Sequence, residues 1–263
     1  MSTSGTIESI WRYPVKSMRG EEVDQAFVGF AGVYGDRLYA FRSAAGPKGF
    51  PYLTAREQKA MLRYTPRFRH PEAAAQPANL TEAQGMAPGV TLLYADPADL
   101  AVEVVAPSGE VLAIDDPALV RQLREGLGAE HELTLLRSER ALTDCRPVSL
   151  FSVQTARKLG DELGAAVDKR RFRANLYVDF PSSDGFVEDE FIGHTLRIGA
   201  KAVISILERD PRCKLITLDP ETGESNPQLM RPVAQGHDGK AGVYAAVLVE
   251  GIIRRGDEVV LLN

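Results

Sequence analysis

A single cysteine near a polar, proline-containing turn is the feature of this sequence with the clearest chemistry. Cys213 follows the apolar run 203–207, and its neighbours include the cations Arg209, Arg212 and Lys214. Nearby cations favour the thiolate over the thiol, and the thiolate is the form that attacks electrophiles or binds a metal. A soft thiolate suits a soft, high-valent metal–sulfur centre. The same residues also allow the alternative of a partly buried structural cysteine.

Cationic residues elsewhere in the chain have the chemistry of an anion site. Lys16 and Ser17 follow the proline that ends the first expected strand, where an ammonium and a hydroxyl can hold a phosphate oxygen. Guanidinium groups bind phosphate through paired hydrogen bonds. We therefore interpret four further residues as walls of one anion pocket: Arg37, Arg56, Arg173 and Arg212. The alternative is a surface ion pair for Arg37 and Arg56, a solvated barrel exterior for Arg173, and an exposed turn lysine for Lys16.

Two more polar residues are candidates for recognising a ligand. Residues 172–179 alternate polar and apolar side chains, which predicts a strand that carries Arg173 and Asn175 on one face. The amide of Asn175 both donates and accepts hydrogen bonds, and Asp144 accepts them. The alternative for Asp144 is a turn aspartate. Arg56 is expected at the start of a helix over residues 55–63, where the helix N-terminus favours anions.

The elements expected to position these residues are mostly short strands. Apolar or alternating runs predict strands over residues 7–12, 38–41, 102–105, 203–207, 243–249 and 259–262. Such a series favours a barrel or a sandwich. Helices are expected to begin after the N-caps Asp116 and Ser152. With no βαβ rhythm and no glycine-rich nucleotide loop, the sequence predicts a mainly β, α+β fold.

Composition limits the classes of function. The 263 residues carry a formal net charge of -5, whereas nucleic-acid-binding proteins usually have a basic balance, so we expect no nucleic-acid partner. We see no signal peptide and no apolar run long enough to span a membrane, and we expect a cytoplasmic protein. Cys145 and Cys213 are both expected to be free thiols, Cys145 as a small structural residue. Two cysteines cannot hold a four-cysteine iron–sulfur cluster.

Several short motifs follow one another along the chain in the order seen in a known family. They are Tyr13-Pro14-Val15-Lys16-Ser17, Gly35-Asp36-Arg37, Leu53-Thr54-Ala55-Arg56, Asp144-x-x-Pro147-Val148, Phe172-Arg173-x-Asn175-Leu176, Glu188-Asp189, Arg212-Cys213 with Thr217-x-Asp219-Pro220-x-Thr222-Gly223, Gly242-Val243-Tyr244 and Gly256-Asp257-x-Val259. Their order resembles that of MOSC-domain proteins, in particular the mitochondrial amidoxime-reducing component and its bacterial relatives. That family often has Trp shortly after the acidic pair, where this chain has Glu190-Phe191-Ile192-Gly193. The pair itself is interpreted as part of a solvated loop.

The resemblance implies a particular division of the chain and a cofactor. It implies an N-terminal MOSC-type β-barrel domain over residues 1–125 and a MOSC domain, also a β-barrel, over residues 126–263. The molybdenum cofactor is expected in the cleft between them, with the Cys213 thiolate on the metal. By the same resemblance, Asp144 lies near the metal with a catalytic role. The residues implied to bind the cofactor are Lys16, Ser17, Arg37, Arg56, Arg173, Asn175 and Arg212.

The activity implied by the resemblance is reductive. N-hydroxylated small molecules would lose oxygen by cleavage of the N–O bond, with electrons from a separate ferredoxin-like or flavodoxin-like donor protein. One alternative is a sulfur-carrier or cofactor-carrier protein that uses a persulfide on Cys213 without redox turnover. Another is a pterin- or anion-binding module that catalyses nothing.

Overall fold

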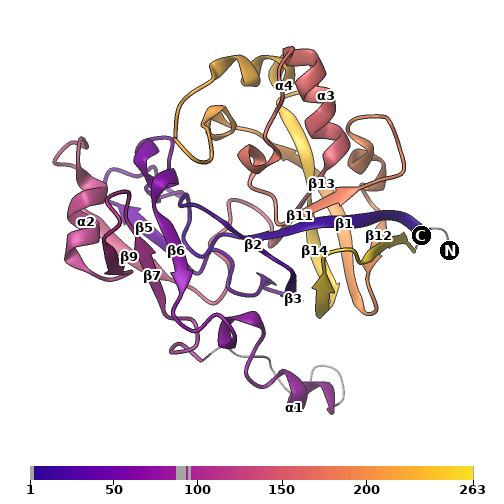
Figure 1. Ribbon diagram of the computed structural model, residues 1–263, viewed down its shortest axis with the longest axis horizontal. Coiled ribbons are helices and arrows are strands. Elements are labelled where there is room, and N and C mark those ends of the chain that lie inside the picture. The colour runs from indigo at the N-terminus through magenta and orange to yellow at the C-terminus, as the bar shows by residue number, and fades with distance from the viewer. Residues whose placement is uncertain (1–2, 87–92, 94–95, 263) are drawn as a thin grey trace.

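The computed structural model describes residues 3–86, 93 and 96–262. Figure 1 shows two lobes side by side, one in purple and magenta from the first half of the chain and one in orange and yellow from the second. Strands make up most of both lobes, as the sequence predicts. Among the described residues, no helix is long and apolar enough to cross a membrane.

The larger lobe is a closed barrel of seven described strands. In order around the barrel, they are β11 (Leu176–Asp179), β10 (Val148–Ser152), β14 (Lys240–Val249), β13 (Ala202–Pro211), β12 (Thr195–Ile198), β16 (Glu258–Leu261) and β1 (Thr3–Arg12), and β1 pairs with β11 to close it. A short strand, β2 (Glu21–Val23), pairs with β1 outside the ring. The first strand of the chain therefore belongs to a barrel whose other strands come from residues 148–261.

A bulge in β1 lets this strand pack on the barrel core. Ile7 and Ile10 are three residues apart, a spacing that places side chains on opposite faces of a regular strand. The register with β11 shifts between Ile7 and Ser9, and the extra residue brings both isoleucines into the same buried cluster. Both are at most 1% exposed, and each such burial stabilises the fold by about 1.5–3 kcal/mol.

The smaller lobe contains short sheets around a second core. Strand β5 (Tyr39–Ser43) pairs with β9 (Leu133–Arg137), and β7 (Val102–Val105) lies between β6 (Thr65–Phe68) and β8 (Val111–Ala113). A third sheet joins the two halves of the chain, because β3 (Gln25–Gly29) pairs with both β4 (Gly32–Val33) and β15 (Gly251–Arg254), and its buried residues Ala26, Val28, Val33 and Ile253 pack in the barrel core. The division of the chain into domains at residues 1–125 and 126–263 stays a prediction.

Two predicted helices begin at their expected caps. The Asp116 carboxylate accepts a hydrogen bond from the Ala118 N–H at the start of α2 (Pro117–Arg124), and the Ser152 hydroxyl accepts one from the Thr155 N–H at the start of α3 (Val153–Leu163). The remaining helices are α1 (Leu80–Gln84), α4 (Met230–Gly236) and the 3-10 turns η1 (Lys59–Arg63), η2 (Ala73–Ala75), η3 (Lys169–Phe172), η4 (Val187–Phe191), η5 (Lys214–Thr217) and η6 (Pro227–Leu229).

The strand predicted over residues 172–179 is wrong in its first half. Phe172 ends η3, Arg173 has a left-handed backbone with φ of 52°, and β11 begins only at Leu176. Arg173 and Asn175 therefore both lie outside the strand, and their side chains do not share a strand face. The alternation of polar and apolar residues continues through the turn, which is why the pattern extends too far.

The acidic pair near residue 188 is not a solvated loop. Glu188 lies in η4 with a fully buried side chain. Its carboxylate accepts hydrogen bonds from the Ser152 N–H at 3.2 Å and the Thr155 hydroxyl at 2.9 Å, so it stabilises the first turn of α3. Burial raises its pKa, against the opposing effect of these hydrogen bonds. Glu188 therefore has a structural role.

Candidate functional site

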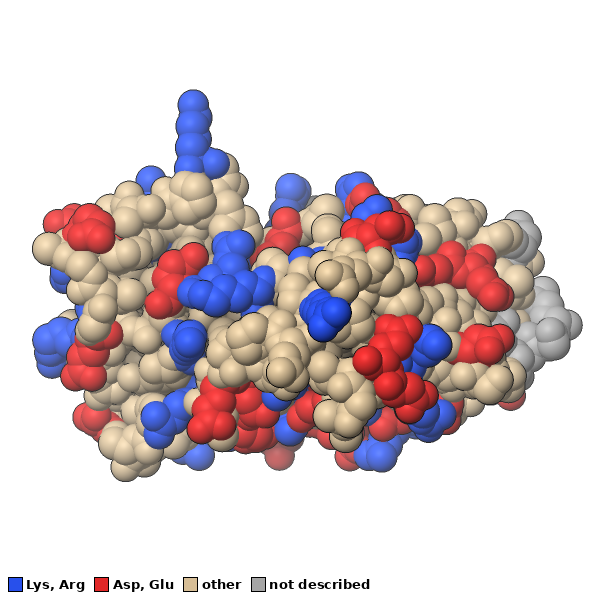
Figure 2. Space-filling model, turned by 90° about the horizontal axis from the view of Figure 1, so that it is seen from above, with Lys and Arg blue, Asp and Glu red and all other residues tan. Residues whose placement is uncertain are grey.

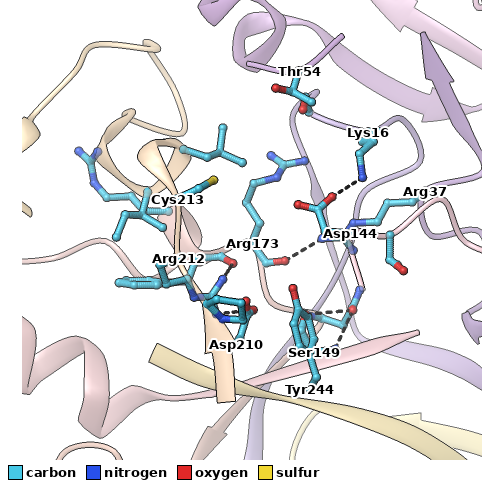
Figure 3. Close-up of a pocket in the computed structure, with 18 of the residues that line it drawn as sticks. Lys16, Arg37, Thr54, Asp144, Ser149, Arg173, Asp210, Arg212, Cys213 and Tyr244 are labelled. Carbon is cyan, nitrogen blue, oxygen red and sulfur yellow. Dashed lines mark hydrogen bonds and ion pairs between the residues drawn. The ribbon is translucent and has the colours of Figure 1, made fainter. Parts of the chain in front are cut away.

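One cavity gathers every residue that the sequence singles out for binding or catalysis. Figure 3 shows Cys213 and Arg212 on one side of it, Lys16, Arg37 and Asp144 on the other, and Arg173 between them. The walls come from both halves of the chain: Lys16, Ser17, Arg37, Thr54, Arg56, Thr143, Asp144, Arg146, Ser149, Arg171, Phe172, Arg173, Asn175, Asp210, Pro211, Arg212, Cys213, Leu215, Ile216 and Tyr244. The cavity therefore exists only where the two halves meet.

The cavity is strongly cationic. Among the described residues that line it, seven cations face two carboxylates, namely Lys16, Arg37, Arg56, Arg146, Arg171, Arg173 and Arg212 against Asp144 and Asp210. The chain as a whole has a net charge of -5. On the face seen in Figure 2, Lys and Arg are interspersed with Asp and Glu. The excess of positive charge is therefore a property of the cavity, and it suits a small anionic ligand.

Lys16 and Asp144 form an ion pair at one wall of the cavity. The Lys16 ammonium donates to the Asp144 carboxylate and, at 2.8 Å, to the carbonyl oxygen of Leu142. Lys16 is only 4% exposed, so it is not the surface lysine of the alternative interpretation. Burial lowers its pKa, although Asp144 acts in the opposite direction. Burial alone would raise the pKa of Asp144, but Lys16, Arg37 and Arg56 outweigh it and lower that pKa.

A second cationic wall is built around the ring of Tyr13. The guanidinium of Arg37 lies 4.6 Å from the ring centroid and that of Arg173 lies 4.2 Å from it. A guanidinium at this range is attracted by the ring's electrons. Burial, reinforced by the charge of Arg37, lowers the pKa of Arg173 to about 10. The Arg37 guanidinium also pairs with the buried Asp36 carboxylate at 2.5 Å, which offsets part of the positive charge of this wall.

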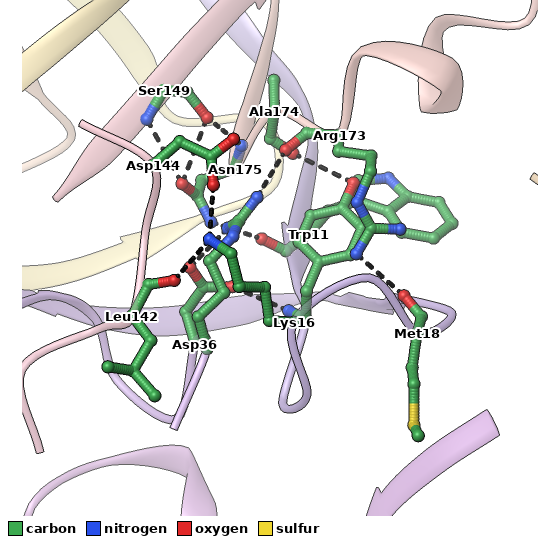
Figure 4. A network of polar contacts seen from close by, with 12 residues as sticks. Trp11, Lys16, Met18, Asp36, Leu142, Asp144, Ser149, Arg173, Ala174 and Asn175 are labelled. Atoms are coloured by element: carbon green, nitrogen blue, oxygen red, sulfur yellow. Dashed lines mark hydrogen bonds and ion pairs between the residues drawn. The ribbon is translucent and has the colours of Figure 1, made fainter. Parts of the chain in front are cut away.

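Three residues that line the cavity have left-handed backbone conformations, which set the directions of their side chains. Ser17, Arg37 and Arg173 have φ values of 65°, 46° and 52°. Such conformations cost a non-glycine residue about 1–2 kcal/mol and persist only when surrounding contacts fix them. The fixing contacts include the hydrogen bond from the Arg37 N–H to the Tyr13 carbonyl oxygen at 2.7 Å and that from Arg173 Nη2 to the Met18 carbonyl oxygen at 2.8 Å. Figure 4 shows part of this network.

Asn175 lines the cavity, but its side chain is already used within the fold. Its Oδ1 accepts from the backbone N–H of Ser149 at 3.2 Å, and its Nδ2 donates to the Trp11 carbonyl oxygen at 3.2 Å (Figure 4). The amide therefore joins β1, β10 and the start of β11. These contacts leave it less free to recognise a ligand edge than the sequence interpretation assumed.

Cys213 is a free, exposed thiol at the end of the barrel strand β13 and immediately before η5. Its neighbour Arg212 is nearly buried and is held by three groups: the carbonyl oxygens of Ala241 at 2.7 Å and Phe172 at 2.9 Å, and the Asp210 carboxylate at 2.7 Å. Because Arg212 is anchored on the barrel, the loop that presents Cys213 has a fixed base.

The cations expected beside Cys213 are distributed differently from the prediction. Of the described residues Arg209, Arg212 and Lys214, only Arg212 lines the cavity. Arg209 instead pairs with Asp189 at 2.9 Å and Asp238 at 3.2 Å. Its neighbour Asp210, by contrast, lines the cavity. Apart from Arg212, the cations of the cavity come from distant parts of the sequence.

Arg56 reaches the cavity from a turn rather than from a helix. Residues 55–57 form a turn, and the helical turn begins only at η1. The Arg56 Nε donates to the Thr54 hydroxyl at 3.1 Å, and its guanidinium lies 5.0 Å from the ring of Phe50. The predicted helix N-terminus behind Arg56 is therefore wrong, although the side chain lines the cavity.

Sequence reasoning missed several residues of the cavity. Asp210 on β13 and Tyr244 on β14 are the most informative, because a hydrogen bond joins their side chains and both line the space beside Arg212. The signal for Asp210 was its place in phase with Ala202, Ile204 and Ile206, the buried apolar residues of the same strand. The others are Thr54, Thr143, Arg146, Ser149 and Arg171. Of these, Arg146, Ser149 and Arg171 contact distant segments, which sequence spacing does not reveal.

Cys145 is exposed as well, contrary to its interpretation as a small structural residue. Its sulfur lies 3.8 Å from the Glu208 carboxylate. Burial and the Glu208 charge raise its pKa. Cys145 is not among the described residues that line the cationic cavity, so the two thiols differ in position and surroundings.

A closed β-barrel that presents an exposed thiol to a cationic cavity between two lobes defines the class of this protein. Residues 137–260 match the MOSC domain, and residues 4–116 match the MOSC N-terminal beta barrel domain. The chain belongs to the family of MOSC-domain proteins. This confirms the resemblance at the level of the domain, whereas the narrower likeness to amidoxime-reducing proteins stays a prediction. The comparison with curated proteins gives no match.

Solved structures give more distant likenesses. YiiM from Geobacillus stearothermophilus is 21% identical over 45% of this chain and 55% of its own, with a TM-score of 0.36. The YUAD protein from Bacillus subtilis is 12% identical over 97% of this chain and 93% of its own, with a TM-score of 0.48. YiiM from Escherichia coli is 15% identical over 45% of this chain and 55% of its own, with a TM-score of 0.32. This chain thus spans about half the length of the YiiM proteins.

Proposed function

We propose that this protein binds the molybdenum cofactor in the cationic cavity, with the Cys213 thiolate on the metal, and reduces N-hydroxylated compounds. The observation that carries the proposal is the placement of a free, exposed thiol in a cavity lined by seven cations. A pterin cofactor with a phosphate group is a small anion, and a thiolate is the ligand that a soft metal–sulfur centre takes from a protein. Membership of the MOSC family adds to this support.

The donor set of the chain fits a metal that arrives with most of its ligands. Among the described residues, no group of three or more His, Cys, Asp or Glu side chains is placed to hold a metal ion. A metal at Cys213 would therefore take one ligand from this chain and the others from its own cofactor. The dithiolene of a pterin cofactor provides such ligands.

The residues of the cavity have distinct tasks in this proposal. Arg37 and Arg173 bind the anionic part of the cofactor, because both are buried cations directed at one space. Lys16 keeps Asp144 ionised, so Asp144 orients polar groups by accepting hydrogen bonds. Arg212 anchors the loop of Cys213. The bound cofactor would supply the two-electron redox chemistry.

The substrates proposed are hydroxylamines, amidoximes and N-hydroxylated bases, which lose their oxygen as water. The electrons come from a separate ferredoxin-like or flavodoxin-like protein, because the two cysteines of this chain cannot hold a four-cysteine cluster. The opening of the cavity to solvent gives both the substrate and the electrons a route to the thiol.

The test measures molybdenum per chain in protein made in a host rich in the cofactor. The wild type should hold close to one atom per chain, and Cys213→Ala should lose most of it. Cys145→Ala is the matched control, since it removes the other exposed thiol outside the cavity, and it should keep the wild-type content. Protein with molybdenum is then assayed with an amidoxime and a reduced viologen dye.

Two results would contradict the proposal. A wild-type chain without molybdenum, from a host in which a known molybdoenzyme is loaded, would overturn it and leave the persulfide carrier as the hypothesis to test on Cys213. Equal molybdenum in wild type and Cys213→Ala would overturn the role of the thiol as metal ligand.

A further inference from the structure

We propose that Asp210 is the proton donor of the cavity and that the Tyr244 hydroxyl tunes it. The inference rests on the proposed function, because it assigns the source of a proton that N–O cleavage consumes. Asp210 lies on barrel strand β13, three residues before Cys213, and its side chain lines the cavity although the residue is only 3% exposed. A nearly buried carboxyl that still borders the reaction space is well placed to deliver a proton there.

The immediate partners of Asp210 lie just after β13 and on β14. Arg212 follows the last residue of β13, with Nη2 2.7 Å from the Asp210 carboxylate. Tyr244 lies on the adjacent strand β14 and forms a hydrogen bond with it. Figure 3 shows the three side chains together below Cys213. Arg212 is held in addition by two backbone carbonyl oxygens, so the geometry around Asp210 is fixed.

Charged groups on other segments also act on Asp210. Burial is the largest influence and raises the pKa of Asp210 to about 6. Arg212, the Tyr244 hydroxyl and Arg37 lower this pKa, whereas Asp144 raises it. The resulting pKa lies close to neutral pH, so the carboxyl both holds a proton and releases it readily.

The two carboxyls of the cavity are therefore held in different states. Lys16, Arg37 and Arg56 keep Asp144 ionised by lowering its pKa, while burial keeps a proton available on Asp210. Carboxyl pairs whose surroundings separate their pKa values in this way divide acid and base work between them. Asp144 then accepts hydrogen bonds, and Asp210 donates the proton.

The reaction balances with this assignment. A hydroxylamine group, R–NH–OH, takes two electrons and two protons and gives R–NH2 and water. The N–O bond breaks, the oxygen leaves with the proton from Asp210, and the nitrogen takes the second proton from solvent. The electrons come from the reduced donor protein of the proposed function. Solvent at the cavity opening returns the proton to Asp210.

The test compares pH profiles of turnover for molybdenum-loaded variants. For the wild type, the rate should fall as pH rises through about 6, because Asp210 loses its proton. Asp210→Asn should lose about 100- to 10,000-fold in rate and lack this limb, since an amide has no proton to give. Asp210→Glu should retain the limb. Tyr244→Phe should move the limb to higher pH, because the hydroxyl lowers the pKa of Asp210.

A matched control variant and a second measurement distinguish a proton donor from a residue with a merely structural role. Asp189 is another carboxylate paired with an arginine, Arg209 at 2.9 Å, and it is not among the described residues that line the cavity. Asp189→Asn should keep the wild-type limb. In the cofactor-free chain, carbon-13 resonances of labelled aspartates should show one carboxyl that titrates near 6 and disappears in Asp210→Asn.

Each result decides between distinct conclusions. A loaded Asp210→Asn variant that is slower but keeps the pH limb would overturn the inference and make Asp210 a positioning residue for Arg212. Absence from the wild type of an aspartate resonance that titrates near 6 would also overturn it. A wild type that lacks molybdenum would overturn the proposed function instead, which the metal assay registers separately.

Discussion

Arg37 donates a hydrogen bond of 2.9 Å to the carbonyl oxygen of Arg173, although 136 positions separate them in the sequence. Both residues have left-handed backbones, and both guanidinium groups lie against Tyr13. The relationship ties the first half of the chain to the second at the centre of the cavity. The cationic wall is therefore a product of contact between the halves, and changes at this contact should affect binding and stability together.

The ring of Tyr13 should contribute more to the stability of this wall than the hydroxyl does. Tyr13→Leu removes two cation–π contacts and a buried ring, and it should lower the free energy of unfolding by about 2–4 kcal/mol. Tyr13→Phe keeps the ring and removes the hydroxyl, which donates at 3.3 Å to the Ala174 carbonyl oxygen and also hydrogen-bonds with the Tyr177 side chain, and it should cost about 1–2 kcal/mol. Urea unfolding of both variants measures the difference. Equal losses would show that the hydroxyl, not the ring, is what counts.

The left-handed conformation of Arg173 predicts an unusual order of stability. Arg173→Gly and Arg173→Ala lose the same guanidinium, but only alanine has a Cβ that is strained at a φ of 52°. The glycine variant should therefore be the more stable of the two by about 1 kcal/mol. In a helix or a strand the order would be the reverse, so thermal unfolding of the pair tests the backbone directly.

The Lys16–Asp144 pair should show strong coupling. Asp144→Asn leaves a buried ammonium without its carboxylate and should lower the free energy of unfolding by about 1–3 kcal/mol. The estimate is modest because the Asp144 side chain is 58% exposed, and solvent screens the pair. Lys16→Met should cost less, because it removes the buried charge as well.

The double variant of Lys16 and Asp144 completes a cycle that isolates their interaction. If the pair is coupled as the contact indicates, the double variant should lose less stability than the sum of the two single changes. Strict additivity in urea unfolding would contradict this and would mean that each residue acts through other neighbours.

Asp210 should give the stability a defined pH dependence. Its folded pKa of about 6 lies above the value of about 3.9 in an unfolded chain, so between these values the folded state alone holds the proton. The contribution of Asp210 is therefore full below this window, and stability falls as pH rises through it. Relative to Asp210→Asn, the wild type should lose about 2 kcal/mol between about pH 4.5 and about pH 7.5. A difference that does not change with pH would contradict the raised pKa.

The fold was predictable where patterns are local. The alternation in residues 203–207 indicates β13, and the caps Asp116 and Ser152 mark the starts of α2 and α3. The error at residues 172–179 has a local cause too, because side-chain alternation does not report the sign of φ at Arg173. The helix predicted over residues 55–63 is present only as a turn at 55–57 and the 3-10 turn η1, although Thr54 and Glu57 form the hydrogen bond of a capping box at 2.6 Å.

The candidate site was predictable only in part. The order of the motifs identified Lys16, Arg37, Arg173 and Cys213 as candidate site residues, and the fold gathers them in one cavity. No spacing rule could place Asp210 against Tyr244, because their contact depends on the register between β13 and β14. The register in turn contains bulges, which shift side chains from one face to the other. Residues that depend on pairing between distant strands escape sequence reasoning for this reason.

The position of β1 has a consequence for how the protein is made. During synthesis β1 emerges before two of its partners, β11 and β16, which lie at residues 176–179 and 258–261. Until the ribosome has added those residues, the short β2 is the one partner among the described strands that is available to pair with it. An unpaired strand edge invites association with other chains. The barrel therefore closes only after residues 258–261 have been made, and a nascent chain halted before residue 258 carries an apolar strand without one of its barrel neighbours.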